Sequence, residues 1–257
     1  MIKGFRDPKS KIILHIPHSS TKIPFYDGYL VDEKVLKEEQ LFLTDWYTND
    51  LYDHPNIISV IAGFSRIFCD VERFSDDSME IMSKVGMGVI YENRDNGTPL
   101  RIIKPAMRTR IIEEFYNPHH QRLYKAVEDQ LRQSGQAFIL DCHSFPNIPF
   151  KRDLNQNLNR PDFNIGTDEF HTSSNLLEVA KQFFIDRNFS VGINTPYSGT
   201  IVPMKFYQKN KNVQSLMLEI NRRLYLNDNT NRKSGDYPIV KETVQEFISD
   251  LVNYPLR

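Results

Sequence analysis

Three apolar runs of strand length, each containing acidic or histidine side chains, constrain the fold of this chain most. Residues 138–145 (FILDCHSF) begin as an apolar run, which stops at an acid and His143. Residues 12–19 (IILHIPHS) have the same pattern and end at His18, and residues 215–222 (SLMLEINR) hold a glutamate inside an apolar run. Such runs predict buried strands that deliver polar groups to a crevice at the carboxyl edge of an open α/β sheet.

Two histidines and a carboxylate near the ends of separate strands are typical of a hydrolytic metal site. A zinc ion that hydrolyses an amide needs three protein ligands and an open position for water. His18 and His143 are the first two candidates; on spacing alone, structural histidines are the alternative. The third position after the first histidine, often a glutamate ligand, is Thr21. We therefore predict Asp45 as the third ligand, with Asp141 as the alternative.

The glutamate of the third run, Glu219, is the candidate general base. A buried carboxylate is unfavourable by several kcal/mol unless it is paired or protonated. A functional reason is a base that deprotonates the attacking water and then protonates the leaving amine. The alternative is a salt bridge to Arg222, which we also assign to the substrate-binding residues.

Two arginines, Arg66 and Arg73, are candidates for anion recognition. Arginine suits both an oxyanion and a substrate carboxylate, which it binds through two hydrogen bonds. The pair is seven residues apart, and odd separations lie on opposite faces of one strand. They converge only if the strand ends between them; otherwise they are surface or ion-pair arginines.

The remaining histidines and the cysteines give weaker signals. His15, His120 and His171 are minor candidates for the site, and His54 and His119 are predicted surface residues. Cys69 and Cys142 form no disulfide framework or CxxC motif and are predicted to be buried small residues.

The order of elements predicts one α/β domain over residues 1–257, with helices on both faces of a mostly parallel or mixed sheet. Strands are expected at residues 11–18, 57–62, 65–73, 137–142, 162–165, 189–194 and 213–220. Helices are expected at residues 31–53 (with Thr44 as an internal N-cap), 104–133 (interrupted at Pro118), 173–187 and 238–252. Residues 74–100 and 146–160 are irregular, which is typical of a lid or wall of a site.

Composition limits the partners. The formal net charge is −1, from 32 basic and 33 acidic residues, so no basic footprint for nucleic acid or an anionic membrane is present. The longest apolar runs have strand length, which predicts no transmembrane helix. Residues 1–6 lack the apolar region of a signal peptide, so we expect a cytoplasmic protein.

An ordered set of motifs resembles the N-formylglutamate amidohydrolase family and covers roughly residues 11–226. The motifs are IPHS (16–19), TDW (44–46), LY (51–52), SR (65–66), DVER (70–73), DCHS (141–144), NTPYSG (194–199) and LEINRRLY (218–225). The resemblance implies a phosphorylase/hydrolase-like fold similar to zinc carboxypeptidases and aspartoacylases, a three-layer αβα sandwich with one zinc ion per chain. It also implies hydrolysis of N-formyl-L-glutamate to L-glutamate and formate, a step of histidine degradation.

Carried over by position, the resemblance implies a role for each matching residue. The implied zinc ligands are His18, Asp45 and His143, and the implied general base is Glu219. Arg66 matches the arginine on the oxyanion side, and Arg73 matches the arginine that binds a substrate carboxylate. The implied substrate loop holds Asn194, Tyr197 and Ser198. Asp162, Asn164 and Gly166 resemble a family stretch beside the site.

Two positions depart from the family pattern. Glu72 stands where the motif usually has asparagine, and a carboxylate there would offset part of the charge of Arg73. Residues 200–203 (TIVP) stand where a second glycine is more typical, which predicts a narrower pocket.

The leading hypothesis is therefore a metal-dependent amidohydrolase that acts on a small N-acyl amino acid, with zinc or another divalent ion, as a monomer or small homo-oligomer. A carboxypeptidase-like or other N-acyl-amino-acid hydrolase is the alternative within enzymes. A catalytically silent protein that binds a metal or an amino acid is the alternative outside them.

Overall fold

A six-stranded mixed sheet forms the centre of the computed structural model, which describes residues 11–227 and 230–254. Its strands are β1 (Ile12–Ile16), β2 (Ile58–Ile61), β3 (Ala137–Phe145), β4 (Phe163–Gly166), β5 (Val191–Ile193) and β6 (Val213–Asn221). The spatial order is β2-β1-β3-β6-β4-β5. The first four strands in this order are parallel, while β4 runs antiparallel to β6 and parallel to β5. The predicted α/β class with a mixed sheet is confirmed.

The two central strands, β3 and β6, are buried along their whole length. Their near-continuous apolar sequences fit parallel strands that are covered on both faces. Alternate residues serve opposite faces: Leu140 packs in the cluster that includes residues of α5 and α6, whereas Ile139 packs in the cluster that includes residues of α4. This burial fixes the register of the sheet, since a shift by one residue would exchange the faces.

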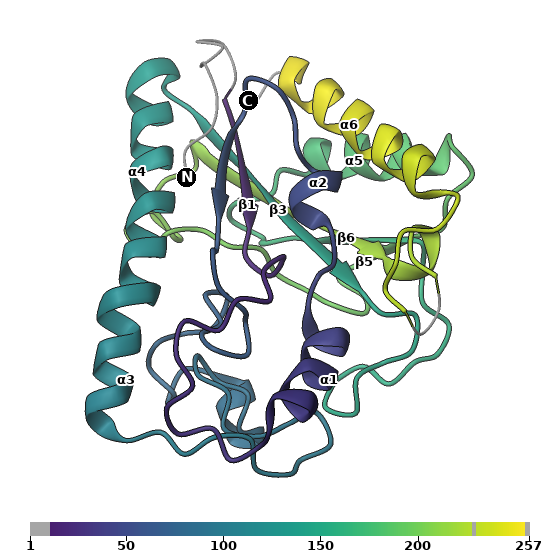
Figure 1. Cartoon of the computed structure of the whole chain (residues 1–257). Coiled ribbons are helices and arrows are strands. Elements are labelled where there is room, and N and C mark those ends of the chain that lie inside the picture. The colour runs from purple at the N-terminus through teal and green to yellow at the C-terminus, as the bar shows by residue number, and fades with distance from the viewer. Residues whose placement is uncertain (1–10, 228–229, 255–257) are drawn as a thin grey trace.

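Helices lie on both sides of the sheet (Figure 1). The helices are α1 (Glu33–Leu43), α2 (Thr48–Leu51), α3 (Pro105–Ile111), α4 (Asn117–Ser134), α5 (Ser174–Ile185) and α6 (Tyr237–Asn253). In Figure 1, α4 runs along one side, and α2, α5 and α6 lie on the other. Three short helical segments complete the elements: η1 (Ile81–Val85), η2 (Ile112–Tyr116) and η3 (Arg222–Leu224).

A π-helical turn, η2, joins α3 to α4. The predicted interruption at Pro118 takes this form, and the helical path continues through it. Proline lacks an N–H group, and its ring clashes with the carbonyl four residues earlier. The wider turn avoids that clash; within it, the Asn117 N–H donates to the Ile112 carbonyl, five residues back.

The predicted helical stretch over residues 31–53 divides into α1 and α2, and its remaining residues are not helical as predicted, because the chain leaves the helix at Thr44. Asp32 caps the first turn of α1 by accepting a hydrogen bond from Val35 N at 2.8 Å. Thr44 is the C-cap of α1 in an extended conformation, so its predicted role as an N-cap is also wrong. The break lets the Asp45 N–H donate to the His18 carbonyl at 3.0 Å. This contact brings the segment between α1 and α2 to the end of β1.

The predicted strand over residues 65–73 is also wrong: the segment is a series of turns. Phe68 N and Cys69 N both donate to the Ser65 carbonyl, at 2.9 and 3.1 Å. These local bonds satisfy the backbone without a neighbouring strand. The alternating apolar residues of this segment pack instead in an apolar cluster outside the sheet, which we call the distal cluster. It includes Ile67, Phe68, Val71, Val89, Tyr91, Leu100 and Ile111.

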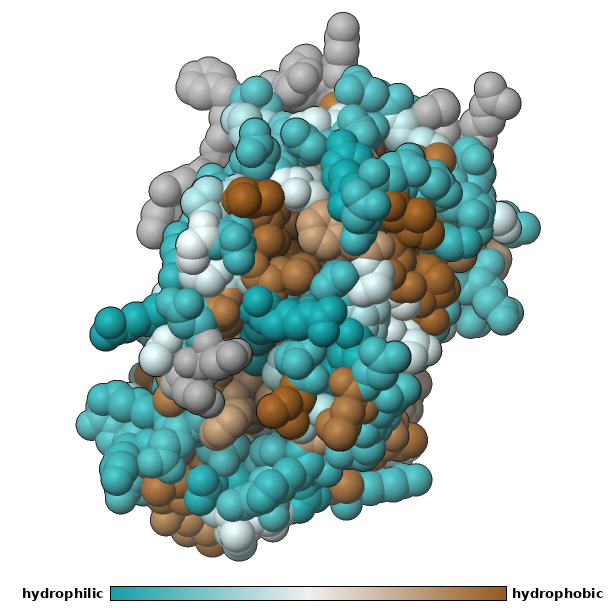
Figure 2. Space-filling model, turned by 90° about the vertical axis from the view of Figure 1, so that its right-hand side faces the viewer, coloured by the Kyte–Doolittle hydropathy of each residue, from teal (hydrophilic) through white to brown (hydrophobic). Residues whose placement is uncertain are grey.

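No helix within residues 11–227 and 230–254 combines the length and the apolar composition needed to cross a bilayer. Figure 2 shows the side of the molecule where α5 and α6 lie. Apolar patches there are interrupted by hydrophilic residues, as on an ordinary solvent-facing surface.

Candidate functional site

A cavity of about 1020 Å³ lies at the carboxyl edge of the parallel strands. His18, Asp141, His143 and Glu219 reach it from β1, β3 and β6 or from just beyond them. Parallel strands end at the same edge of a sheet, which is why side chains distant in sequence meet here. The two irregular stretches, 74–100 and 146–160, both contribute residues to the cavity lining and so form part of its wall.

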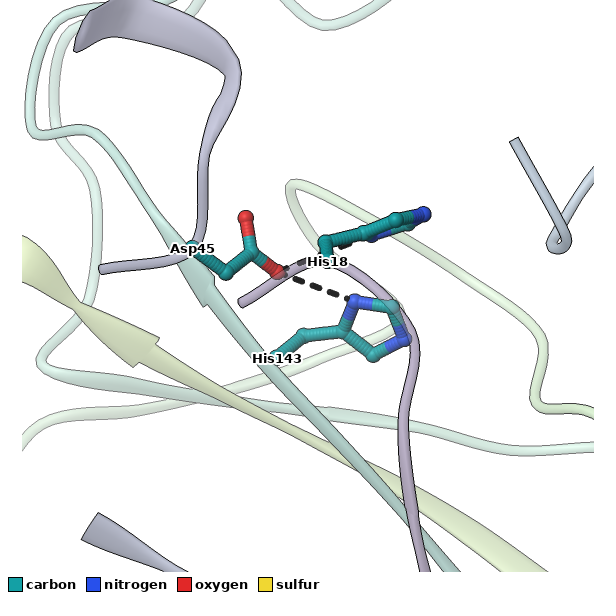
Figure 3. Close-up of side chains that lie close together, drawn as sticks. All are labelled: His18, Asp45 and His143. Atoms are coloured by element: carbon teal, nitrogen blue, oxygen red, sulfur yellow. Dashed lines mark hydrogen bonds and ion pairs between the residues drawn. The ribbon is translucent and has the colours of Figure 1, made fainter. Parts of the chain in front are cut away.

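His18, Asp45 and His143 form a compact cluster (Figure 3). Asp45 Oδ2 lies 3.2 Å from His143 Nδ1 and 3.7 Å from His18 Nδ1. All three residues are buried, and one potential ligand atom from each lies within 4.8 Å of the others. His143 belongs to β3 rather than following it as predicted, because β3 pairs with β6 as far as Phe145.

The cluster fits a divalent metal ion by its donors and its outer contacts. His18 Nδ1 is buried and has no hydrogen-bond partner within residues 11–227 and 230–254. Its Nε2 donates to Asp70 Oδ1 at 2.7 Å, and His143 Nε2 donates to Asp141 Oδ1 at 3.1 Å. Histidine ligands commonly donate their second N–H to a carboxylate, which leaves the other nitrogen free for metal. Two imidazoles and one carboxylate suit zinc.

Asp45 is held as a carboxylate by its neighbours. Ser144 N donates to Oδ2 at 3.2 Å, and Arg222 Nη2 donates to Oδ1 at 2.9 Å. Burial alone would raise the pKa of Asp45, but the neighbouring imidazoles of His143 and His18 and the charge of Arg222 hold it well below its usual range. Asp45 therefore has the geometry of a ligand, while Asp141 serves as the outer partner of His143.

Arg222 lies behind Asp45 and not on the cavity surface. Its guanidinium also donates to Ser144 and to the carbonyl of Phe42, and the residue is buried. Among the described residues that line the cavity, Arg222 does not occur. The structure thus shows Arg222 as a partner of Asp45, with no salt bridge to Glu219 among the described residues, and its contact with substrate stays a prediction.

Glu219 lies in the cavity wall, directly opposite His143 in the pairing of β6 with β3. The residue is 7% exposed, and its Oε2 has no hydrogen-bond partner among the described residues. Burial raises the pKa of Glu219 to about 8, although the nearby charge of His143 opposes the shift. An unpaired carboxylate beside the histidine cluster is suited to accept a proton.

Arg66 and Arg73 converge on Asp70, although their segment is not a strand. Arg66 Nη2 lies 2.9 Å and Arg73 Nε lies 3.6 Å from Asp70 Oδ2. Burial would raise the pKa of Asp70, but the charges of Arg66 and His18 hold it well below its usual range. The sequence reasoning gave Asp70 no role. Its spacing, four residues after one arginine and three before the other, was the available signal.

The sequence suggested that Glu72 would offset the charge of Arg73, but the described residues show no ion pair between the two. Glu72 Oε1 lies 3.1 Å from His15 Nδ1, whereas the carboxylates near Arg73 are Asp70 and Glu80. The charge of Arg73 is therefore not offset by Glu72 through a direct ion pair.

The predicted substrate loop divides into two parts. Tyr197 and Ser198 line the cavity. Tyr197 Oη donates to Asp153 Oδ2 at 2.8 Å and accepts from Arg160 at 3.2 Å. Asn194 instead bonds to Thr167 through both ends of its amide and is not among the described lining residues.

The stretch that resembles a family segment beside the site supports this loop. Asn164 donates to the Tyr197 carbonyl at 2.9 Å and accepts from Thr195 N at 3.0 Å. Asp162 lies farther out, paired with Arg223.

The minor candidates have varied positions. The predicted surface location of His119 is wrong, since the residue is fully buried between α4 and the sheet. His15 is also buried, His120 lines the cavity, His171 accepts from Gln208 N, and His54 is half-buried. Cys69 and Cys142 are buried free thiols, as predicted.

Comparisons with known proteins agree with the motifs. The family model described as N-formylglutamate amidohydrolase matches residues 10–226. An N-formylglutamate deformylase from Pseudomonas putida is 23% identical over 239 residues, which cover 88% of this chain and 86% of that protein. The crystal structure of an N-formylglutamate amidohydrolase from Ralstonia eutropha JMP134 superposes with a TM-score of 0.86 at 22% identity, covering 99% of this chain and 97% of the other. A gene product of Agrobacterium tumefaciens gives a TM-score of 0.65 at 17% identity, with 95% and 92% covered. The two structures share the fold.

Proposed function

The chain belongs to the N-formylglutamate amidohydrolase family, and from this premise we propose that it hydrolyses N-formyl-L-glutamate to L-glutamate and formate. The observation that carries the proposal is the position of the unpaired Glu219 carboxylate beside the cluster of His18, Asp45 and His143. A base next to a metal-binding cluster is the arrangement that water needs to attack an amide.

We propose that His18 Nδ1, Asp45 and His143 Nδ1 hold one zinc ion. The bound ion would polarise the substrate carbonyl and lower the pKa of water at the site. The free His18 Nδ1 and the outer contacts of both histidines support this assignment. Arg222 would act as a positioning residue that orients Asp45.

Glu219 would move the proton. Its carboxylate accepts a proton from the attacking water as the oxygen bonds to the formyl carbon. The same proton then passes to the amide nitrogen as the C–N bond breaks, which yields formate and the amino group of glutamate. Burial raises the pKa of Glu219, so this carboxylate takes up a proton more readily than an exposed one and can carry it from the water to the amine.

Arg66 and Arg73 would bind the anionic parts of the substrate. Arg66 lies on the metal-site side, 3.9 Å from Asp45, and would stabilise the developing oxyanion. Arg73 is less tightly paired: in the described part of the chain its Nε has no hydrogen-bond partner, and the carboxylate oxygens of its ion pairs lie 3.6 and 3.9 Å away. It therefore has donors for a substrate carboxylate, and Tyr197 and Ser198 would complete the pocket.

The finer parts of the sequence interpretation belong to the same proposal. Helices on both faces of the sheet support a three-layer αβα sandwich of the zinc carboxypeptidase type. A single domain, a cytoplasmic location, a step in histidine degradation, and a monomer or small homo-oligomer stay predictions of the sequence.

Metal content and formate release from N-formyl-L-glutamate test the proposal together. Wild type should hold about one zinc ion at the His18–Asp45–His143 cluster and release formate, and His143→Ala should lose both. Glu219→Gln should keep that zinc but lose about 10²–10⁴-fold in turnover.

A panel of N-acetyl amino acids and dipeptides tests whether the protein hydrolyses amides other than N-formyl-L-glutamate. Zinc binding with turnover only on another amide would contradict the formylglutamate assignment but keep the hydrolase. Full activity of Glu219→Gln would contradict its role as the base.

A further inference from the structure

A second group of potential metal ligands lies beside the first. His15 Nδ1 lies 2.8 Å from Asp141 Oδ1 and 3.1 Å from Glu72 Oε1, and one ligand atom from each residue lies within 4.8 Å of the others. His15 and Asp141 come from neighbouring parallel strands, where they are paired in register. Glu72 reaches them from the turns that follow β2. The three residues have no assigned role as a ligand set in the proposed reaction.

His120 Nε2, a buried atom on the same wall as Glu72, has no hydrogen-bond partner among the described residues. Buried polar atoms are normally paired, so each such exception calls for an explanation. Both residues line the same cavity as Asp141.

The outer contacts of this group resemble those of the first cluster. The other ring nitrogen of His15, Nε2, lies 2.8 Å from His119 Nε2 on α4, which fixes the imidazole orientation. Asp141 Oδ2 accepts from Ile201 N at 3.2 Å. A carboxylate oxygen has more than one lone pair, so Asp141 Oδ1 can accept the N–H of His143 and still face a cation.

We propose that His15, Glu72 and Asp141 form a second divalent metal site, beside which His120 lines the cavity. One imidazole nitrogen with two carboxylate oxygens suits a first-row transition ion such as zinc better than calcium or magnesium. The site goes beyond the proposed function, because the hydrolysis derived above uses only the first cluster.

The position of the second site gives it a chemical role. Asp141 would connect the two sites, since it contacts His143 of the first cluster at 3.1 Å. Glu72 precedes Arg73 in the chain, and both line the cavity. A cation held there would add positive charge on the side where Arg73 is proposed to bind the substrate carboxylate.

Zinc stoichiometry tests the inference without any substrate. Metal-stripped protein is dialysed against excess zinc, and zinc per chain is measured for wild type, Glu72→Gln, Asp45→Asn and Asp76→Asn. Glu72→Gln removes a ligand of the second site, and Asp45→Asn removes a ligand of the first. Asp76→Asn is the matched control, since Asp76 lines the same cavity outside both ligand sets. Circular dichroism checks the fold of each variant, and His15→Asn repeats the test from β1.

Wild type and Asp76→Asn should bind about two zinc ions, and Glu72→Gln, His15→Asn and Asp45→Asn about one each. One ion in wild type, one in Glu72→Gln and none in Asp45→Asn would overturn the second site while keeping the first. Such a result would leave His15 as an imidazolium paired with two carboxylates. Two ions in both wild type and Glu72→Gln would also overturn the assignment, because the second ion would then bind elsewhere.

Discussion

Asp70 connects several parts of the site, although the sequence alone did not indicate a role for it. It accepts the N–H of His18, binds Arg66 and lies near Arg73. Tyr91, from the distal cluster, donates to its Oδ2 at 2.7 Å. One carboxylate thus contacts the imidazole of His18 and the side chains of both arginines.

Replacing Asp70 by asparagine should weaken zinc binding by about 10–100-fold, the usual effect of losing an outer partner of a histidine ligand. The amide can still accept one hydrogen bond but cannot neutralise the two arginines. Competition with a chromophoric chelator measures the affinity. Asp76→Asn, which is not a partner of any site histidine, should bind as wild type does. An unchanged affinity in Asp70→Asn would exclude the orienting role.

The sequence predicted site residues where the signal is local. His18, His143 and Glu219 follow or interrupt apolar runs, so their positions at the sheet edge were readable. Asp70 and Arg222 act through contacts across long stretches of chain, with His18 and Asp45 respectively. Such contacts leave no periodic pattern, so neither positioning role was predicted.

At the scale of elements, the four-residue helix α2 depends on its neighbours for stability. Asp50 on α2 receives hydrogen bonds from Lys233 at 2.7 Å, from Tyr237 at 2.7 Å and from Lys241. Tyr237 and Lys241 belong to α6. The carboxylate therefore joins α2 to α6, next to the segment that carries Asp45.

Asp50→Asn should lower the free energy of unfolding by about 1 kcal/mol at pH 7, a modest amount because the group is partly exposed. Burial would raise the pKa of Asp50, but hydrogen bonds from Lys233, Lys241 and Tyr237 hold it well below its usual range. A carboxyl with a lowered folded-state pKa stabilises the protein above its unfolded pKa, which is about 3.9, and loses that effect at lower pH.

The difference between wild type and Asp50→Asn should therefore be full above about pH 5 and shrink below about pH 4. Urea unfolding at several pH values measures it, with the exposed Asp53→Asn as the control. A difference that stays constant down to pH 3 would show that charge is not its origin.

Elements were predicted best where burial alone determines them. The runs of β3 and β6 are apolar throughout and were recognised, although β3 extends three residues beyond its predicted end. Residues 65–73 have strand-like alternation but pack in the distal cluster. Periodicity reports which residues are buried, but it does not say whether they are buried against a sheet or within turns.

At the scale of the molecule, the first cluster draws its three members from segments far apart in the chain. His18, Asp45 and His143 lie after β1, between α1 and α2, and within β3. These segments meet only in the folded state, so zinc should bind the folded protein far more tightly than the unfolded chain.

Zinc should therefore raise the unfolding temperature. At a free concentration about 100 times the dissociation constant, the stabilisation is about 2.7 kcal/mol per site, or several degrees in a chain of this size. Differential scanning calorimetry with and without a chelator measures the shift. Because Asp45→Asn removes a ligand of the first cluster, it should show a smaller shift than wild type. An equal shift in both would place the stabilising zinc elsewhere.

The π-helical turn between α3 and α4 changes the rotational phase of the helical path. Ile111 at the end of α3 packs in the distal cluster, while Leu123 and Val127 of α4 pack against the sheet. The continuous helical path from α3 to α4 therefore packs in two apolar clusters, the distal cluster at one end and the cluster between α4 and the sheet at the other. Tyr116, the last residue of the turn, and His120, in the first turn of α4, line the cavity between them. Because the helical path is anchored in both clusters, it fixes the position of this wall of the cavity relative to the sheet.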